Sequence, residues 1–526
     1  MSKPRTIEGR WWLQGEGQPP HFGTLSFDPE KGLGLIVKVP HNRTPLQLLR
    51  RSVEKLKVPE VIYGKDAQDH DVTLFGCSDI KCSRSLGLDS YEITDIGAAI
   101  LDCRVPAWEE ARFPFAQVRY TLLTRWLNRY VRWENDKKDD TVKDGCMCLR
   151  FKEHEEMEFE LSSDVRLRIA GTCLRASSRD EFSLSWEHSI WFLFKTPLPP
   201  KPILEEYAFA FLRLLCLLSG ERVFIEELRF WDADPFGPGH HHKPLGSFEL
   251  LMRSEGIAEA ERDLHAAHMI AGFDEIAADF SGILKRWFEC HDKLRPVLDL
   301  FFSVVSNWVL TDESRFLFLA QALEVYHARS THFSSTEGPE SEHERRMKAI
   351  LETAPEKERR WLERKLAFSN QKDLSRRIDE FLKAHKDEAT RLTAKIDDFA
   401  TKVRVSRNYY THYSEKHLES GKVATGLELR RIVYALSALL EICLLKELGI
   451  RGKPVERILE RNASIVWGDL EKGAPTGPKR EGERPVGGGG PETAKTGDVS
   501  GEALDQLAAE IWDQDDRHAP PTHPAR

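Results

Sequence analysis

The spacing of apolar residues changes once along this chain, at about Asp279. Within residues 1–197, short segments alternate apolar and polar side chains, as in GTLSF, MEFEL and VRLRIA. From Asp279 onward, apolar residues recur every three or four positions. Alternation is typical of half-buried strands, and a period near 3.6 is typical of helices that pack along one side. The sequence therefore predicts an α+β multidomain chain, with a β-rich N-terminal part and an all-α C-terminal part.

Composition and turn signals suggest where these parts end. The strands should pair antiparallel, because helix-length segments between them are missing apart from TLLTRWLNRYV. TPLPPKP marks one boundary, and the Gly- and Pro-rich stretch after Lys472 has too few apolar residues to fold. We expect four parts: a β-rich domain (1–197), a mixed helical connecting region (198–278), a helical bundle (279–471) and a disordered linker and tail (472–526).

The helices of the bundle have recognisable starts and stops. Thr311 followed by two acidic residues predicts a helix start, and Gly449 predicts a stop. The expected helices cover residues 312–330, 340–367, 374–386, 389–409 and 423–448.

Composition also limits the compartment and the partners. Nine cysteines, an odd number, lie scattered in mostly apolar stretches, which predicts reduced core thiols. We expect no signal peptide and no membrane contact, and hence a cytoplasmic protein. The formal net charge of −9 argues against a general nucleic-acid coat but permits a local anion site.

One segment runs against that negative charge, since no acidic residue occurs from Phe399 to Ser414. The helix expected there carries an apolar stripe at Leu392, Ile396, Phe399 and Val403. Arg407 comes next on that stripe, so its guanidinium needs a partner. The partner could come from elsewhere in the fold, from a second subunit or from an anionic ligand such as phosphate. Glu324 is one candidate, unless it faces solvent.

His412 follows Arg407 by five residues, about 140° around an ideal helix. The two side chains can converge only if the helix ends between them or if two copies of the motif meet. Asn408 and His412, four residues apart, share a face.

These residues offer a limited chemistry. A histidine can exchange a proton with a hydroxyl near neutral pH, and an arginine can stabilise the extra charge of a pentacoordinate phosphorus. Together they could cleave RNA without a metal or other cofactor, using the 2′-hydroxyl as nucleophile. Tyr409 and Tyr410 offer stacking faces for a nucleotide. The alternative is a polar helix end whose histidine only caps backbone carbonyls.

Other candidate sites are weaker. His240, His241 and His242 are consecutive and cannot all face one metal ion well. His265 and His268 are expected to be a packed or surface pair. The run Cys290-His291-Asp292 has the residue types of a nucleophilic triad, but neighbours in sequence rarely form one. No metal site is predicted.

The segment SRNYYTHY, followed by a long apolar helix, resembles the motif of HEPN ribonucleases. Their pattern is an arginine, a polar residue, several variable residues and a histidine, which Arg407, Asn408 and His412 match. Five N-terminal segments resemble the N-terminal domain of ApeA-type anti-phage proteins; they read GRWWLQG, FGTLSFD, VIYGKD, DVTLFGC and RFPFAQVRYTLLTRWL. The resemblance covers most of residues 1–455 and none of the tail after residue 472.

The resemblance implies a defence protein that cleaves RNA when a phage component triggers it, stopping growth of the infected cell. Arg407 would bind the scissile phosphate, His412 would be general acid or base, and Asn408, Tyr409 and Tyr410 would bind substrate. The substrate would be cellular RNA, with tRNA among the candidates. HEPN nucleases usually act as dimers, so we expect a homodimer or higher homo-oligomer. The alternative is a catalytically inactive HEPN-like module for assembly, joined to a ligand-binding β domain.

Overall fold

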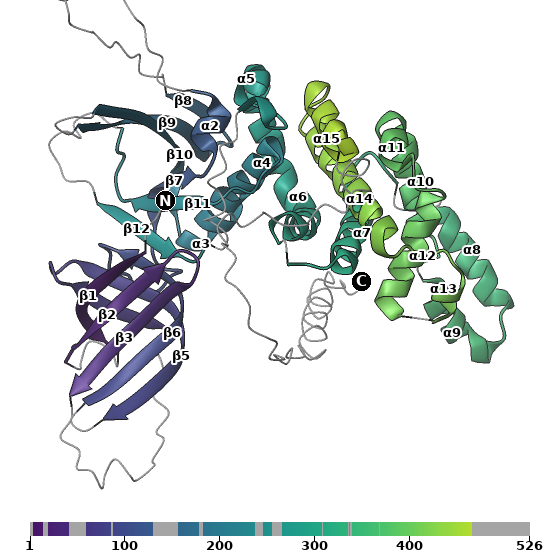
Figure 1. Cartoon of the computed structure of the whole chain (residues 1–526). Helices are drawn as coiled ribbons and strands as arrows, with labels where there is room; N and C mark the ends of the chain where they lie inside the picture. The colour runs from purple at the N-terminus through teal and green to yellow at the C-terminus, as the bar shows by residue number, and fades with distance from the viewer. Residues whose placement is uncertain are drawn as a thin grey trace, which may run out of the picture. The chain divides into compact units, whose positions relative to one another are not determined.

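A computed structural model shows the architecture of the chain (Figure 1). The structure describes residues 4–13, 19–40, 59–85, 88–129, 156–177, 182–236, 246–254, 266–307, 309–334, 336, 339–367, 369–413 and 415–464. Several predictions fall outside these residues, namely those on Cys146, Cys148, His240, His241, His242, His265 and the tail 472–526.

The first six strands form a closed antiparallel sheet. They are β1 (Arg5–Trp12), β2 (His21–Asp28), β3 (Gly32–Pro40), β4 (Val61–Asp66), β5 (Asp71–Ser85) and β6 (Leu88–Leu101). Their order is β3-β2-β1-β4-β5-β6, and β3 also pairs with β6, where Leu35 lies opposite Ile93. Alternate side chains point inside, where Trp11 is fully buried. Gly64 makes room for that indole, since a Cβ there would lie 2.3 Å from the Trp11 ring.

An open antiparallel sheet continues from β6. Its strands are, in order, β12 (Ser247–Met252), β11 (Ile225–Trp231), β7 (Phe113–Tyr120), β10 (Phe182–Leu198), β9 (Val165–Ser177) and β8 (Met157–Glu160). The predicted β-rich, antiparallel N-terminal part is confirmed. Two of the strands, β11 and β12, come from the segment 198–278, which we expected to be a mixed helical connecting region. The helix expected in TLLTRWLNRYV is short: α2 (Leu123–Leu127) ends because Asn128 is left-handed, with φ of 54°.

The C-terminal part is helical, as predicted. Ahead of it, α3 (Pro200–Pro202), a π-helical turn (Ile203–Ala208) and α4 (Phe209–Ser219) follow the open sheet. The later helices are α5 (Phe273–Ile276), α6 (Phe280–Ser306), α7 (Asp312–Arg329), α8 (Glu340–Thr353), α9 (Glu356–Leu366), α10 (Leu374–Ala384), α11 (Lys386–Thr393), α12 (Phe399–His412), α13 (Glu415–Glu419), α14 (Gly426–Glu447) and α15 (Lys453–Ser464). Within the described ranges, every helix is too short or too polar to cross a bilayer.

Two of the expected helices are each broken in two. The helix expected over 340–367 is interrupted at Pro355, because the residue before a proline is driven to extended backbone, and Ala354 has ψ of 144°. The helix expected over 389–409 is interrupted before Phe399, since Asp398 adopts a left-handed conformation with φ of 53°. The apolar stripe across the second break is buried nonetheless, because the interruption keeps these side chains on the inner side.

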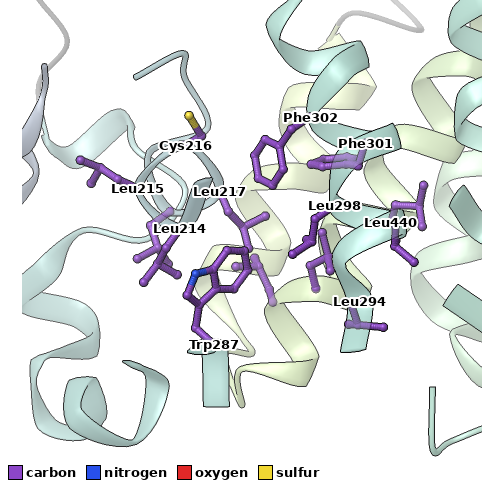
Figure 2. Packing of buried hydrophobic residues seen from close by; sticks show 14 of the residues in the cluster. Leu214, Leu215, Cys216, Leu217, Trp287, Leu294, Leu298, Phe301, Phe302 and Leu440 are labelled. Carbon is purple, nitrogen blue, oxygen red and sulfur yellow. The ribbon is translucent and has the colours of Figure 1, made fainter. Parts of the chain in front are cut away.

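The open sheet and the helices share one hydrophobic core. The cluster contains Phe230 of β11, Phe211 of α4, Trp287 of α6 and Leu440 of α14. Figure 2 shows side chains of α4, α6 and α14 gathered in that core, and the Trp287 indole N–H donates to the carbonyl of Ala210 (2.9 Å). The closed sheet has a largely separate core around Trp11. The core is therefore continuous across the boundary predicted at TPLPPKP, and the domain limits at 197, 278 and 471 stay predictions.

Candidate active site on helix α12

Helix α12 is held firmly against the start of α14. Its inner side buries Phe399, Val403 and Ser406. The backbone N–H of Ala424, just before α14, donates to Oγ of Ser406 (2.9 Å), and the Tyr410 hydroxyl donates to the carbonyl of Ala424 (2.8 Å). Two hydrogen bonds in a buried setting therefore fix the part of α12 that carries the predicted motif.

Arg407 lies at the edge of that buried side, with its side chain 38% exposed. Its Nη2 is 3.6 Å from Oε2 of Glu324 on α7, and the Glu324 side chain is 29% exposed. The structure thus supplies the intramolecular partner that the sequence raised as one candidate. At 3.6 Å the contact is a loose ion pair rather than a hydrogen bond, so a stronger anion could displace it.

His412 is the last residue of α12 and is exposed. The helix ends after it, because Tyr413 is left-handed with φ of 47°. Arg407 and His412 therefore sit on one uninterrupted helix, about 140° apart. Of the two routes to convergence, an end of the helix between the two residues is excluded.

Arg404 extends the exposed side of the motif. Arg404, Asn408 and His412 follow at intervals of four residues, so they line one side of α12. Arg404 and Asn408 are half-buried, and the Arg404 guanidinium has no ion pair with any residue that the structure describes. Arg404 was not predicted from the sequence, although it precedes Asn408 and His412 at the same spacing of four residues.

The three tyrosines at this helix end differ in exposure. Tyr410 is buried, its ring packs edge-on against Phe316 with centroids 5.9 Å apart, and burial raises its pKa to about 12. The prediction that Tyr410 contacts substrate conflicts with this burial, since both its ring and its hydroxyl serve the core. Tyr409 is half-buried, and Tyr413, which the sequence analysis did not select, is 66% exposed. Their ring centroids lie 5.6 Å apart, so they form an aromatic surface beside His412.

The other candidates do not form sites. Burial raises the pKa of the Cys290 thiol to about 12 and lowers the pKa of His291 to about 4, so this pair is poorly suited to nucleophilic catalysis. The Cys290 thiol donates to the carbonyl of Trp287 instead (3.3 Å). Over the described part of the chain, His, Cys, Asp and Glu side chains nowhere gather in threes that could hold a metal ion.

The sequence matches the models of two known families. The family model described as Apea-like HEPN matches residues 317–453, which include most of α7 and all of α12 and α14. The family model described as ApeA N-terminal domain 1 matches residues 6–287, more than half of the chain. No curated protein and no solved structure matches the sequence. The HEPN match points to nuclease activity on RNA in general terms, and the chain belongs to the ApeA family of anti-phage defence proteins that carry a HEPN domain.

Proposed function

We propose that the chain is a metal-independent endoribonuclease whose active site lies on α12. One observation carries the proposal: Arg407 and His412 both reach solvent from a single helix without acidic residues, within the segment that matches the HEPN family. A basic surface of this kind attracts the phosphates of RNA. The fixed position of α12 supplies the placement that proton transfer requires.

The proposed reaction is an internal transfer at phosphorus. The 2′-hydroxyl oxygen forms a bond to the phosphorus, and the bond from phosphorus to the 5′-oxygen breaks. The proton of the 2′-hydroxyl passes to one His412, and the leaving 5′-oxygen takes a proton from the protonated His412 of the second copy, which gives a 2′,3′-cyclic phosphate and a 5′-hydroxyl. Arg407 stabilises the charge that builds on the phosphoryl oxygens, Asn408 orients the phosphate, and Tyr409 contacts a base.

A second copy of the chain would complete this site. Arg407 and His412 of one helix point in different directions, so a cleft between two α12 helices would bring one Arg407 toward the partner copy's motif. Two exposed apolar side chains just beyond the end of α12 support a homodimer there: Tyr413 and Leu418, which are 66% and 48% exposed. Contact between two such patches would bury apolar surface beside the paired motifs.

The β-rich part is the proposed sensor. The closed sheet has its own core around Trp11, so a phage component could bind it without disturbing the helices. Binding would activate the nuclease if the trigger bound the active arrangement more tightly than the resting one. Substrate and trigger both occur inside the infected cell, so we place the chain in the cytoplasm, with cellular RNA, including tRNA, as substrate.

The test is cleavage of total RNA and tRNA by full-length protein, with analysis of the product ends in the presence of a chelator. We expect cleavage that survives chelation and leaves 2′,3′-cyclic phosphates. A strict need for Mg²⁺ or Mn²⁺, or 3′-hydroxyl products, would contradict the mechanism. The rival function, an inactive assembly module, is favoured by the Arg407–Glu324 ion pair, which gives the arginine a structural partner. That rival predicts no RNA cleavage, and no toxicity to cells that express the chain, even when a phage trigger is present.

A further inference from the structure

A helical hairpin leaves the bundle between α7 and α10. It consists of α8 and α9, and its two ends are held together by a β-bridge between Thr336 and Gln371. All residues of α9 lie in the described part of the chain, and none of them is buried. The hairpin therefore adds little to the core, and its surface composition needs another explanation.

One side of α9 faces α8. Leu362 and Leu366, four residues apart, are half-buried on this side. Arg359 lies on the same side, where its Nε donates to the carbonyl of Ala354 beyond the end of α8 (3.1 Å). These three residues hold the hairpin together, so Arg359 is a structural arginine.

The opposite side of α9 is basic and aromatic. Five side chains, all exposed, fall within an arc of about 140° on an ideal helix. They are Lys357, Arg360, Trp361, Arg364 and Lys365; we call them the α9 face. The three glutamates of this helix lie outside the arc, and the Trp361 side chain is 51% exposed. The four cations form no ion pair with any residue in the described ranges.

Helix α8 shows what an ordinary charged surface looks like in this hairpin. Arg346 lies 3.3 Å from Glu342, and Lys348 lies 4.0 Å from Glu352, each pair four residues apart. Such pairs are typical of a solvated helix that satisfies its own charges. The α9 face has cations without such pairs and an exposed indole among them. Solubility alone does not require this pattern, and exposing a tryptophan works against it.

We propose that the α9 face binds single-stranded RNA, the same substrate that the nuclease site on α12 would cleave. This inference rests on the proposed function, since it names a second contact for the same substrate. The four cations would neutralise successive phosphates, and the Trp361 indole would stack on an unpaired base. A duplex would offer the phosphates but not the base, because its bases are already stacked. Single strands are therefore the form that matches both halves of the surface.

The test measures RNA binding by full-length protein in which His412→Ala prevents cleavage. The probe is a short fluorescein-labelled RNA without secondary structure, titrated at several salt concentrations. Arg360→Gln with Arg364→Gln should weaken binding at least about tenfold and should flatten the slope of log Kd against log salt by about 1.4, or about 0.7 for each lost cation. The control is Arg346→Gln with Lys348→Gln, which removes the same charge from α8 and should change neither quantity.

Trp361→Ala separates stacking from charge. It should weaken binding at least about fivefold while leaving the salt slope unchanged, because it removes no cation. Circular dichroism and elution volume should match the parent chain for every variant. Unaltered affinity in the Arg360/Arg364 variant, an equal loss in the α8 control, or equal affinity for duplex RNA would overturn the proposal. Preference for an acidic peptide over RNA would overturn it too, in favour of a protein partner.

The outcomes also separate this inference from the nuclease assignment. If the α9 face binds RNA but wild-type protein cuts none, the nuclease assignment fails and the binding surface stands. If wild-type protein cuts RNA and the α9 variants bind it normally, only the binding surface fails.

Discussion

Helices α12 and α9 both carry basic side chains at the surface of the helical region, but they differ in how much of each helix is buried. Phe399, Val403 and Tyr410 of α12 are buried, and hydrogen bonds fix the helix to the start of α14. Helix α9 buries none of its residues and packs through the half-buried Leu362 and Leu366, with a hydrogen bond from Arg359 to the carbonyl of Ala354. Proton transfer requires atoms held in place, whereas attraction of a flexible polyanion requires charge that can be reached. This difference suits α12 to catalysis and α9 to the binding of RNA.

The charges of the two helices are also treated differently. On α12, Lys402 is paired with Glu428 and Arg407 with Glu324, so part of its positive charge is balanced at rest. On α9, the cations of the outer side are paired with no residue that the structure describes. A long-range attraction should therefore come mainly from α9, and a short-range contact with one phosphate from α12.

The largest predicted effect tests whether α12 is the site of catalysis, by substitution of the motif residues. His412→Ala should lower RNA cleavage at least about a thousandfold, because no other group could transfer the proton as well. Arg407→Ala should do the same, and Arg407→Lys should fail as well, since a single ammonium lacks the two-pronged contact with phosphate. Cleavage is measured at equal concentrations of folded protein. Normal cleavage by the His412→Ala chain would disprove the assignment.

The second prediction compares one aromatic residue from each helix. Tyr410→Ala should lower the free energy of unfolding by about 3–5 kcal/mol, because it leaves a cavity beside Phe316 and removes a buried hydrogen bond. Trp361→Ala should change it by less than about 0.5 kcal/mol, since the indole is mostly exposed. Denaturant unfolding followed by tryptophan fluorescence and circular dichroism measures both. Similar losses in the two variants would show that α9 is packed after all.

Periodicity was enough to predict the classes of the two halves. The alternating segments became antiparallel strands, and the stripe from Leu392 to Val403 was buried as expected. Helix breaks were harder, because Asp398 is left-handed although no glycine lies beside it to signal a break. The strands β11 and β12 were missed because their alternation is short, and pairing with β7 and β6 decides their structure.

The candidate site shows the same limit. The sequence pointed to Arg407, Asn408 and His412, but it could not tell that Tyr410 turns inward while Tyr413 stays exposed. That difference depends on Ala424, which lies more than ten residues later and accepts the Tyr410 hydroxyl. The residues of the α9 face stand in the sequence as KERRWLERK. Their arrangement on one side of a short helix depends on the break at Pro355, which separates α9 from α8. Contacts with residues distant in sequence, rather than the local pattern, decide which of these side chains are exposed.

The third prediction concerns acid and a buried histidine of α6. Helix α6, which packs against α7, carries the buried His291, whose pKa burial lowers to about 4. In the unfolded chain this imidazole would take up a proton near pH 6.5. The contribution of His291 to the free energy of unfolding is therefore fully present above that pH. It is lost as pH falls from about 6.5 toward 4, which would cost up to about 3 kcal/mol of unfolding free energy. His291→Leu should reduce this sensitivity, because leucine does not titrate. The substitution breaks no hydrogen bond of Nε2, which finds no partner among the described residues.

Helix α9 buries no titrating group, so RNA capture by it should persist over the upper part of that pH range while the chain remains folded. Thermal unfolding between pH 7 and pH 5 checks the stability, and fluorescence anisotropy checks the capture. An unchanged melting temperature over that interval in the wild-type chain would contradict the assignment of His291 as a neutral core residue.

The smallest predicted effect tests the charge balance on α12. Glu324→Gln should raise RNA affinity only several-fold, because a loose, half-exposed ion pair contributes about 1 kcal/mol or less. The melting temperature should hardly change. Glu428→Gln is the matched control: it also removes one acid that faces α12, but it releases Lys402 rather than Arg407. Anisotropy with the His412→Ala chain measures affinity, and cleavage by the active chain measures turnover. If Glu324 only competes with phosphate for Arg407, its loss should raise affinity more than loss of Glu428, with cleavage kept or increased. If cleavage instead falls to background while affinity rises, Glu324 orients Arg407 for the reaction, and the charge balance on α12 is part of the chemistry rather than a resting state.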